Sequence, residues 1–228
     1  MSDGPATEAD AWKKVTDRFD GESIRFGSHW SYNVYNDPKR LAFVLSRYKF
    51  VSRIATKNKR VLELGCSEGL GGRLLAEFAT SYTGIDLDSE AVAVARRNLP
   101  DPKYTFHDGN FLGVSLGEFD TVVSVDVVEH IERDIEHQFF ETCYHNLGED
   151  GVCVVGTPNV TSEAYASAAS KLGHVNLFDG PRLTSTLKRY FHNVFLFGLN
   201  DEVVHTGFTP MTHFLMAVAC YKRREILT

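Results

Sequence analysis

The chain has 228 residues, 43% of them hydrophobic and 24% charged, which is the balance of a folded globular domain rather than of a disordered or fibrous chain. Its formal net charge is −6 and its basic residues are scattered, which argues against DNA or RNA as a partner. No apolar run reaches the ~18 residues of a membrane-spanning helix, and residues 1–20 lack a signal-peptide pattern, so we expect a cytoplasmic protein without membrane contact.

Residues 1–36 are expected to form an N-terminal lid or cap on the domain that follows. Residues 9–19 predict a short amphipathic helix, and residues 25–36 are rich in aromatic and hydrogen-bonding side chains. Asp37-Pro38 then predicts the N-cap and first position of a helix that carries apolar residues at helical spacing up to Ile54. We expect that helix to pack on a sheet.

From Arg60 onward, apolar strand-like runs alternate with helical stretches. Helices are predicted over 70–79, 90–99 and 134–147, and strands over 61–64, 82–85, 104–107, 119–125 and 152–156. Such alternation predicts a parallel sheet with helices on both faces, because parallel neighbours need crossover connections. The expected fold is therefore α/β and doubly wound.

After Pro158 the alternation of predicted strands and helices stops. After a polar stretch, Asp179-Gly180-Pro181 predicts the start of a helix that runs to about Phe191. Two apolar runs, 194–199 and 214–221, then predict an antiparallel pair at one edge of the sheet. We expect one domain with a mostly parallel, seven-stranded, Rossmann-like sheet and an antiparallel edge strand. Its parts are a lid (1–36), a cofactor-binding core (37–160), and a substrate loop, helix and closing hairpin (161–228).

A glycine-rich turn follows the first predicted strand. Glycines at 65, 69, 71 and 72 allow backbone to approach a ligand closely and leave free amides at a helix start. These glycines therefore predict a ligand-binding turn, and the alternative interpretation is a tight strand-to-helix connection that binds no ligand. Ser67 breaks the Gly-x-Gly-x-x-Gly pattern of dinucleotide-binding proteins, and a Gly-Lys-Ser/Thr sequence is missing, so neither that fingerprint nor a P-loop is present. We expect Ser67 to avoid backbone geometry that only glycine tolerates.

Two acidic residues lie where ligands are bound in such sheets. Asp86, 21 residues after Gly65, follows the second strand, where a carboxylate can accept hydrogen bonds from ribose hydroxyls. Asp108 follows the third strand, where it and Gly109-Asn110 are suited to the edge of an adenine, unless Asp108 is simply a turn former. This spacing favours a nucleoside ligand.

Together, five spaced elements resemble the motif series of class I S-adenosylmethionine (SAM)-dependent methyltransferases. They are Glu63-x-Gly65-x-Ser67-x-Gly69, Asp86, His107-Asp108-Gly109, the segment Asp126 to His130, and Asp37-Pro38-Lys39-Arg40-Leu41. The chain looks most similar, over about 37–160, to the ubiquinone-biosynthesis O-methyltransferase type and related bacterial small-molecule methyltransferases. The resemblance implies SAM as cofactor and places the carboxylate of its methionine part on Arg40, for which a surface ion pair is the alternative. The expected cofactor-binding residues are Tyr32, Arg40, Glu63, Gly65, Cys66, Ser67, Asp86, Leu87, Asp108, Gly109, Asn110, Val125 and Asp126.

Methyl transfer to an oxygen also requires removal of a proton, and histidine is the commonest base near neutral pH. His130 follows the fourth strand and is our first candidate, with bracing of the next helix as its alternative role. His174, in the polar loop after Pro158, is the second candidate, with loop packing as its alternative role. His29 and His205 are weaker candidates for the base, because the sequence does not define their position relative to the expected site.

The acceptor is expected to be a small biosynthetic metabolite that is methylated on oxygen or on nitrogen. The spacing of the acidic residues along the sequence indicates no metal site, and the four cysteines are too widely spaced to suggest one. Residues 200–207 form either a substrate or dimer surface or a solvated hairpin, which leaves a homodimer open. The rival functions are a SAM-binding regulator or inactive paralogue, and an aminopropyltransferase that would use Asp126 and Glu129 on a polyamine.

Overall fold

The computed structural model describes residues 7–18 and 23–227, so part of the predicted lid, including Phe19, lies outside the described residues. The helices are α1 (Glu8–Thr16), α2 (Ser28–Asn36), α3 (Lys39–Ala55), α4 (Leu70–Leu75), α5 (Ser89–Asn98), α6 (Glu136–His145), α7 (Ala168–Gly173) and α8 (Gly180–Lys188). The strands are β1 (Arg60–Leu64), β2 (Ser81–Asp86), β3 (Tyr104–Asp108), β4 (Phe119–Val125), β5 (Leu147–Pro158), β6 (Phe191–Asn200), β7 (Val203–His205) and β8 (Phe214–Lys222). Three 3₁₀ turns complete the described elements: η1 (Val128–His130), η2 (Val160–Tyr165) and η3 (Thr209–Met211).

The strands form one sheet in the order β3-β2-β1-β4-β5-β8-β6-β7. β1 to β5 are parallel, whereas β8 is antiparallel to both β5 and β6. The doubly wound α/β class and the antiparallel pairing of the last two apolar runs are confirmed. The sheet has eight strands rather than seven because Val203–His205 adds a short strand beside β6.

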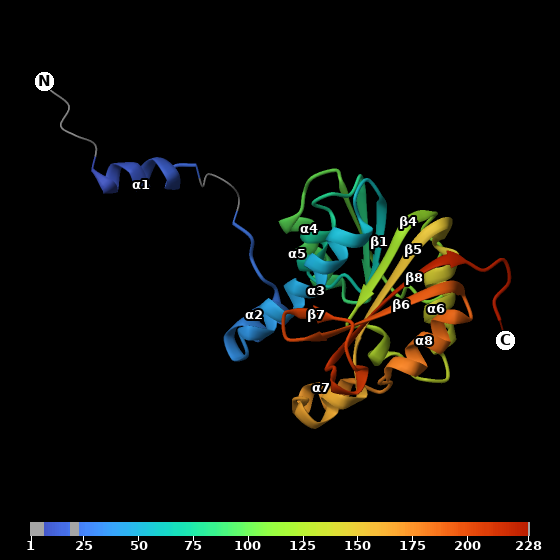
Figure 1. The fold of residues 1–228 in the computed structure, drawn as a ribbon. Coiled ribbons are helices and arrows are strands. Elements are labelled where there is room, and N and C mark those ends of the chain that lie inside the picture. The colour runs from blue at the N-terminus through green and yellow to red at the C-terminus, as the bar shows by residue number, and fades with distance from the viewer. Residues whose placement is uncertain (1–6, 19–22, 228) are drawn as a thin grey trace, which may run out of the picture.

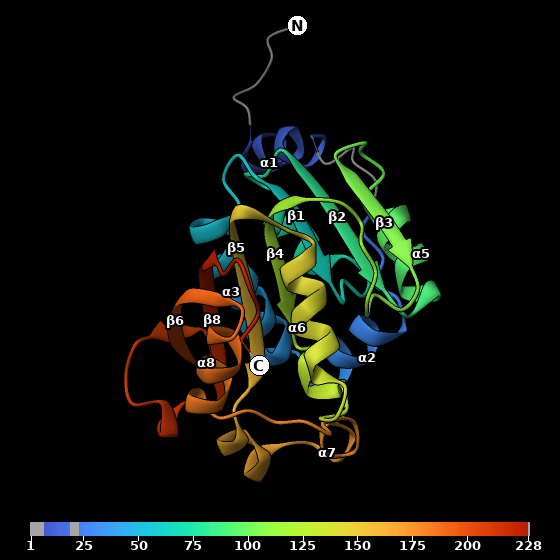
Figure 2. The ribbon, with the colours of Figure 1, turned by 90° about the vertical axis from the view of Figure 1, so that its right-hand side faces the viewer.

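Helices cover both faces of this sheet (Figures 1 and 2). One face packs against α6 and α8, through buried residues such as Phe139, Phe140 and Leu183. The other face packs against α3, α4 and α5, through residues such as Val51, Leu75 and Val92. Two hydrophobic layers therefore hold the sheet rigid, and the connections at the carboxyl ends of β1 to β5 are built on a fixed frame.

Local capping explains where several helices begin. The Asp88 carboxylate accepts hydrogen bonds from Glu90 N and Ala91 N at the start of α5, and Asp179 caps α8 as its sequence predicts. The prediction that Asp37 caps α3 is wrong, because Pro38 occupies that position and Asp37 makes no side-chain cap. α1 forms close to its predicted place, but none of its residues is buried.

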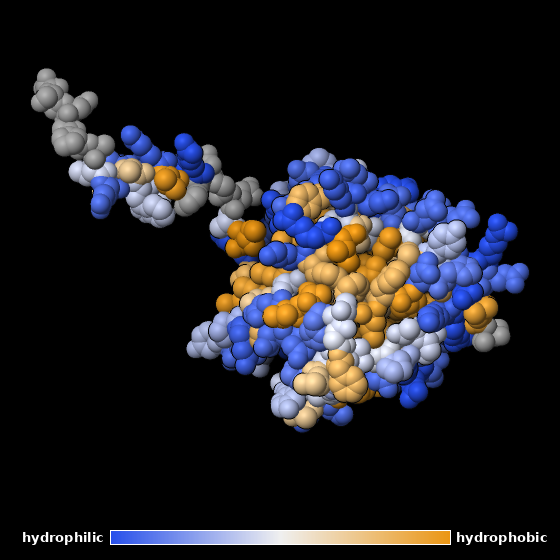
Figure 3. All heavy atoms as spheres, viewed as in Figure 1, coloured by the Kyte–Doolittle hydropathy of each residue, from blue (hydrophilic) through white to orange (hydrophobic). Residues whose placement is uncertain are grey.

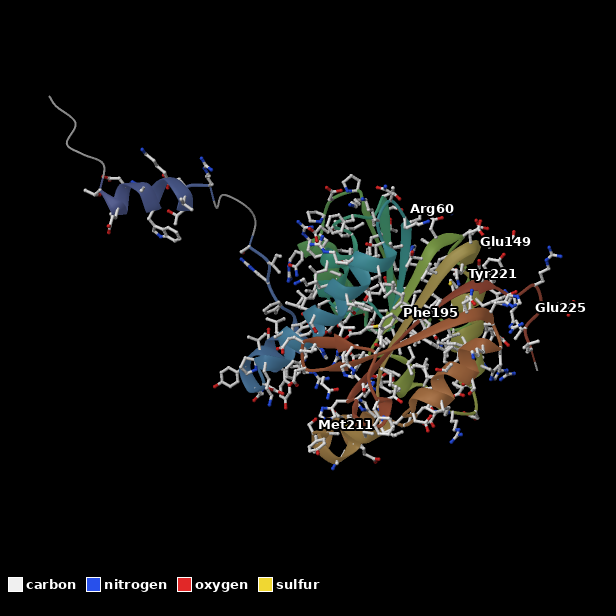
Figure 4. The ribbon with its side chains drawn as sticks, in the orientation of Figure 1. Arg60, Glu149, Phe195, Met211, Tyr221 and Glu225 are labelled. Carbon is white, nitrogen blue, oxygen red and sulfur yellow. The ribbon has the colours of Figure 1, made fainter. Side chains whose placement is uncertain are left out.

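The sheet face on the α3 side is not fully covered by helices. Figure 3 shows apolar side chains gathered over this face, and Phe195 of β6, labelled in Figure 4, is 55% exposed there. Phe197 of the same strand packs against Phe50 of α3, with ring centroids 5.0 Å apart. Within the described residues, no helix is both long enough and apolar enough to cross a membrane.

Candidate active site

The turn between β1 and α4 is built from left-handed backbone. Gly65, Ser67 and Gly69 have φ values of +81°, +47° and +75°. A side chain on Gly65 would lie 2.3 Å from Val127 Cγ2, so both its conformation and its surroundings require glycine. The expectation that Ser67 avoids left-handed geometry is wrong.

A hydrogen bond from Ser67 to the next strand explains how this turn is held. The backbone N–H of Ser67 donates to Asp86 Oδ2 at 2.7 Å, while Asp86 Oδ1 accepts from Asp88 N at 2.9 Å. A charged acceptor strengthens such a bond, which can offset a left-handed strain of about 1 kcal/mol. Asp86 therefore shapes the glycine turn and also lies at its predicted place at the end of β2.

The other two glycines of the turn serve packing. A Cβ atom on Gly71 would lie 2.2 Å from the ring of Tyr48, and one on Gly72 would lie 2.6 Å from the ring of Tyr82. The Tyr82 hydroxyl donates in turn to the carboxylate of Glu63, which is fully buried. Burial raises the pKa of Glu63 to about 7. The Glu63 side chain is hydrogen-bonded to Tyr82 and has no exposed surface. Its direct contact with a cofactor therefore stays a prediction.

Cys66 and Val125 also belong to the interior. Cys66 is 3% exposed, and burial raises the pKa of its thiol well above the ordinary value. Val125, at the end of β4, is likewise 3% exposed. Any part that they take in cofactor binding would therefore come from their backbone, and it stays a prediction.

The ends of β2 and β3 lie side by side and offer an apolar surface with polar edges. Gly109 N donates to Asp86 O at 2.8 Å, which ties the two strand ends together. Leu87 is 73% exposed there, and none of the described residues comes within 4 Å of a Cβ atom built on Gly109. Asp108 is paired with Arg96 at 2.9 Å, and the Asn110 side chain accepts from Leu112 N at 2.9 Å. This open surface is suited to the flat face of an adenine.

Asp126 follows β4 and has left-handed backbone with a φ of +59°. Arg47 of α3 donates from Nη1 to both of its carboxylate oxygens, at 2.8 and 2.6 Å. The guanidinium of Arg47 also lies 3.6 Å above the centre of the Phe214 ring. The sequence analysis did not identify Arg47, although it lies on the same helix face as Arg40, seven residues away.

Arg40 is half-buried near the start of α3. Its guanidinium makes no hydrogen bond or ion pair with any residue in the two described ranges. Its charge acts on both His29 and His174, so Arg40 lies near these two histidines. A half-buried cation of this kind is suited to a ligand carboxylate, as the resemblance implies.

Glu68, within the glycine turn, joins that turn to α2. Its carboxylate accepts hydrogen bonds from Gly27 N at 2.7 Å, His29 N at 2.9 Å and Trp30 N at 3.2 Å. Glu68 is only 4% exposed, and Gly27 leaves room for it. The sequence analysis did not identify this contact. It holds the start of α2 against the turn, and desolvation lowers the pKa of His29 there.

Two aromatic residues of α2 have different surroundings. Trp30 is 6% exposed and belongs to the core on the α3 face. Tyr32 is 64% exposed, and its role at the cofactor stays a prediction.

Both predicted catalytic histidines meet at the carboxyl edge of the sheet. The ring centroids of His130 and His174 are 5.1 Å apart, and His130 Nδ1 lies 2.8 Å from Gly173 O. One potential ligand atom from each of these histidines and from Glu129 lies within 4.8 Å of the others. Spacing alone had suggested no such cluster, because His174 is distant in sequence and is brought in by the loop after β5.

Burial governs ionisation in this cluster. Glu129 is fully buried, and burial together with the nearby Asp126 raises its pKa to about 8. The pKa of His174 is lowered by burial and by His130, so this imidazole is neutral at physiological pH. His205 lies on β7 and contacts Asn200.

The comparison with known protein families agrees with this geometry. A family model described as "Methyltransferase domain" matches residues 36–193, which is more than half of the chain. The chain belongs to this methyltransferase family. The matched segment contains the glycine turn, Asp86, Asp108, Asp126 and both clustered histidines.

Individual relatives of this methyltransferase domain support the same assignment. A probable SAM-dependent methyltransferase of Mycolicibacterium smegmatis is 37% identical over 101 residues, covering 43% of this chain and 38% of the relative. A ubiquinone biosynthesis O-methyltransferase of Glaesserella parasuis is 29% identical over 140 residues, covering 57% of this chain and 56% of the relative. The chain thus spans about half or less of the length of these curated relatives.

Solved structures confirm the fold. The N-methyltransferase NodS of Bradyrhizobium japonicum, solved with S-adenosylhomocysteine, superposes with a TM-score of 0.59 at 17% identity, covering 93% of this chain and 98% of that one. The methyltransferase domain described here is therefore Rossmann-like.

The residues present fit SAM, the cofactor named for the Mycolicibacterium smegmatis relative. The guanidinium of Arg40, which has no partner in the part of the chain that the structure describes, is suited to the carboxylate of the methionine part. The open surface at Leu87 and Gly109 is suited to the adenine. Asp86, at the end of β2, keeps lone pairs for ribose hydroxyls in addition to its two backbone bonds.

Proposed function

We propose that the chain catalyses methyl transfer from SAM to an oxygen of a small biosynthetic metabolite. The observation that carries this proposal is the meeting of His130 and His174 next to Glu129, close enough to Asp126 for its charge to act on Glu129 and His174. In parallel α/β sheets the carboxyl edge is where ligands bind, and here this edge carries both the expected cofactor residues and two imidazoles.

Alignment and proton removal are the tasks that the chain must perform. Bound SAM supplies an electrophilic methyl group on a sulfonium with a good leaving group. The acceptor oxygen forms the new C–O bond as the C–S bond breaks and its electron pair moves to sulfur. A hydroxyl acceptor also loses its proton, which the neutral imidazole of His174 is able to accept. A nitrogen acceptor that is already neutral needs less help of this kind, which is why the histidine pair favours oxygen.

The aminopropyltransferase alternative requires a free acidic pair to bind a polyamine. Arg47 occupies both oxygens of Asp126, and Glu129 is fully buried with a raised pKa. Arg47 thus compensates the charge of Asp126, and Glu129 has no exposed surface for an ammonium group, which supports methyl transfer over that rival.

The experiment combines SAM binding with a search for the acceptor. Calorimetric titration with SAM is expected to show one site, and incubation with labelled SAM and a metabolite extract is expected to give a product heavier by ~14 Da. The His174→Gln variant should keep SAM affinity and lose most of the transfer. Binding without transfer to any extracted metabolite would favour the regulator or inactive paralogue instead.

A further inference from the structure

Glu129, His130 and His174 form a compact cluster of metal-ligand types. Glu129 and His130 belong to η1, directly after β4, whereas His174 follows α7. One ligand atom from each side chain lies within 4.8 Å of the other two, which is the spacing that a single ion can bridge. Two imidazole nitrogens and one carboxylate oxygen form a donor set that divalent transition metals prefer.

We propose that Glu129, His130 and His174 bind a divalent transition-metal ion such as Zn²⁺ or Mn²⁺, which activates the acceptor hydroxyl. The three side chains leave at least one coordination position for a water or an acceptor oxygen, as in catalytic rather than structural metal sites. The inference rests on the proposed methyl transfer to oxygen, and it narrows the acceptor to molecules that present a hydroxyl group.

An unsatisfied buried carboxylate atom points independently to a cation. Glu129 is 0% exposed, and its Oε2 accepts a hydrogen bond from the Thr157 hydroxyl at 3.0 Å. Its Oε1 is buried without a hydrogen-bond partner among the described residues. Burying a carboxylate atom in this way is costly unless a partner is supplied, and a bound cation supplies one.

The surrounding backbone holds the ligand side chains in place before an ion arrives. Gly173 O, 2.8 Å from His130 Nδ1, is suited to accept its N–H, which leaves Nε2 free for an ion, an arrangement common in metal-binding histidines. Val175 N and Asn176 N both donate to Glu129 O, at 2.9 and 3.1 Å. These bonds fix the segment that carries His174 against η1. The cluster is thus pre-organised rather than dependent on loop closure.

An ion bound in this cluster changes how the acceptor hydroxyl loses its proton. Once the imidazole lone pairs bind the ion, His174 is no longer the base. The ion instead lowers the pKa of the acceptor hydroxyl, and the proton passes to solvent water. The oxygen then attacks the methyl group, the C–O bond forms, the C–S bond breaks, and S-adenosylhomocysteine is released.

Metal binding can be measured without SAM or an acceptor. Chelator-treated protein is titrated with Co²⁺ while its visible absorption is followed, and Zn²⁺ is then added as a competitor. We expect one equivalent of Co²⁺ to bind and Zn²⁺ to displace it. The Glu129→Gln and His174→Gln variants should each weaken Co²⁺ binding at least tenfold. If Glu129→Gln does not fold, His174→Gln still tests the site, because His174 lies on a surface loop.

His192→Gln is the matched control. His192 lies at the opposite end of the sheet, where it lines a cavity of about 570 Å³ with Glu149 and Tyr221. Figure 4 shows Glu149 and Tyr221 far from Met211, which lies toward the carboxyl edge. The control should bind Co²⁺ like the wild-type protein. Failure to bind one equivalent, or equal binding by the wild-type and His174→Gln proteins, overturns the metal site.

The outcome is separable from the proposed function. A protein that binds Co²⁺ at this cluster but transfers no methyl group keeps the metal site and loses the proposed function. Methyl transfer that is unchanged after chelation, with no gain on adding Zn²⁺ or Mn²⁺, overturns the role of the ion and leaves the proposed function standing.

Discussion

Arg47 donates from a single nitrogen to both carboxylate oxygens of Asp126, at 2.8 and 2.6 Å. The pair joins α3 to the end of β4, at a residue whose backbone is left-handed. Because both side chains are mostly buried, with exposed fractions of 15% and 24%, the pair should matter more than a surface ion pair does.

We expect Arg47→Met to weaken SAM binding about tenfold, which corresponds to about 1.4 kcal/mol. The substitution leaves Asp126 without its cation, so the strand end that should hold the methionine part of SAM loses its geometry. Calorimetry with SAM measures the change. Arg53→Met is the control, because Arg53 lies on the exposed side of the same helix, 4.6 Å above the Phe78 ring. Equal losses in the two variants would contradict a specific role for Arg47.

Asp86 has two tasks, since it accepts the Ser67 amide and is expected to bind the ribose. Asp86→Ala should raise the SAM dissociation constant more than tenfold, since a charged hydrogen-bond acceptor is worth about 1.5–3 kcal/mol. Asp101→Ala, which removes a comparable local bond to Lys103 N in an exposed turn, should leave SAM affinity unchanged. Unchanged affinity in Asp86→Ala would falsify the assignment of the cofactor site.

Glu68 accepts three backbone amides at the start of α2. Glu68→Gln removes the charge and one acceptor oxygen, so we expect a loss of about 1–2 kcal/mol in stability. We also expect faster tryptic cleavage at Arg25, just before α2. Glu77→Gln, on the exposed surface after α4, should change neither quantity. Cleavage at Arg25 that does not accelerate would show that α2 is held by other contacts.

Gly71 leaves room for the ring of Tyr48. A methyl group placed 2.2 Å from that ring forces the helix and the tyrosine apart, so Gly71→Ala should lower the free energy of unfolding by about 1–3 kcal/mol. Urea unfolding measures this change. Gly207→Ala, whose nearest neighbour is the flexible His205 ring at 3.2 Å, should stay within about 0.5 kcal/mol of wild type.

The buried carboxylate of Glu63 makes stability depend on pH. Its pKa is about 7 in the folded state and near 4.5 in the unfolded chain, so its stabilising effect is complete below pH 4.5 and is lost as the pH rises to about 7. Glu63→Gln should therefore reduce the fall in melting temperature between pH 5 and 8. Glu149→Gln, an exposed control, should retain the wild-type slope.

The elements that the sequence predicted well depend on local rules. Alternating strands and helices, the cap at Asp179, and the position of Asp86 follow from periodicity and from short-range hydrogen bonds. The local prediction for Ser67 was wrong, because its left-handed backbone is held by Asp86 from the neighbouring strand. A residue's own preference can be overridden by one strong contact that is distant in sequence.

By itself, the sequence determined the α/β class, the order of the elements from α3 to β5, and the resemblance to the motif series of SAM-dependent methyltransferases, because all three depend on the spacing of residues along the chain. Only the tertiary structure decided which charges meet. The sheet brings Arg47 to Asp126, Glu68 to the start of α2, and His174 to Glu129 and His130. Such contacts depend on helix phase and loop path, which hydrophobic spacing does not specify. For that reason the possible metal ligands, though visible as single residues, became a cluster only in the folded chain.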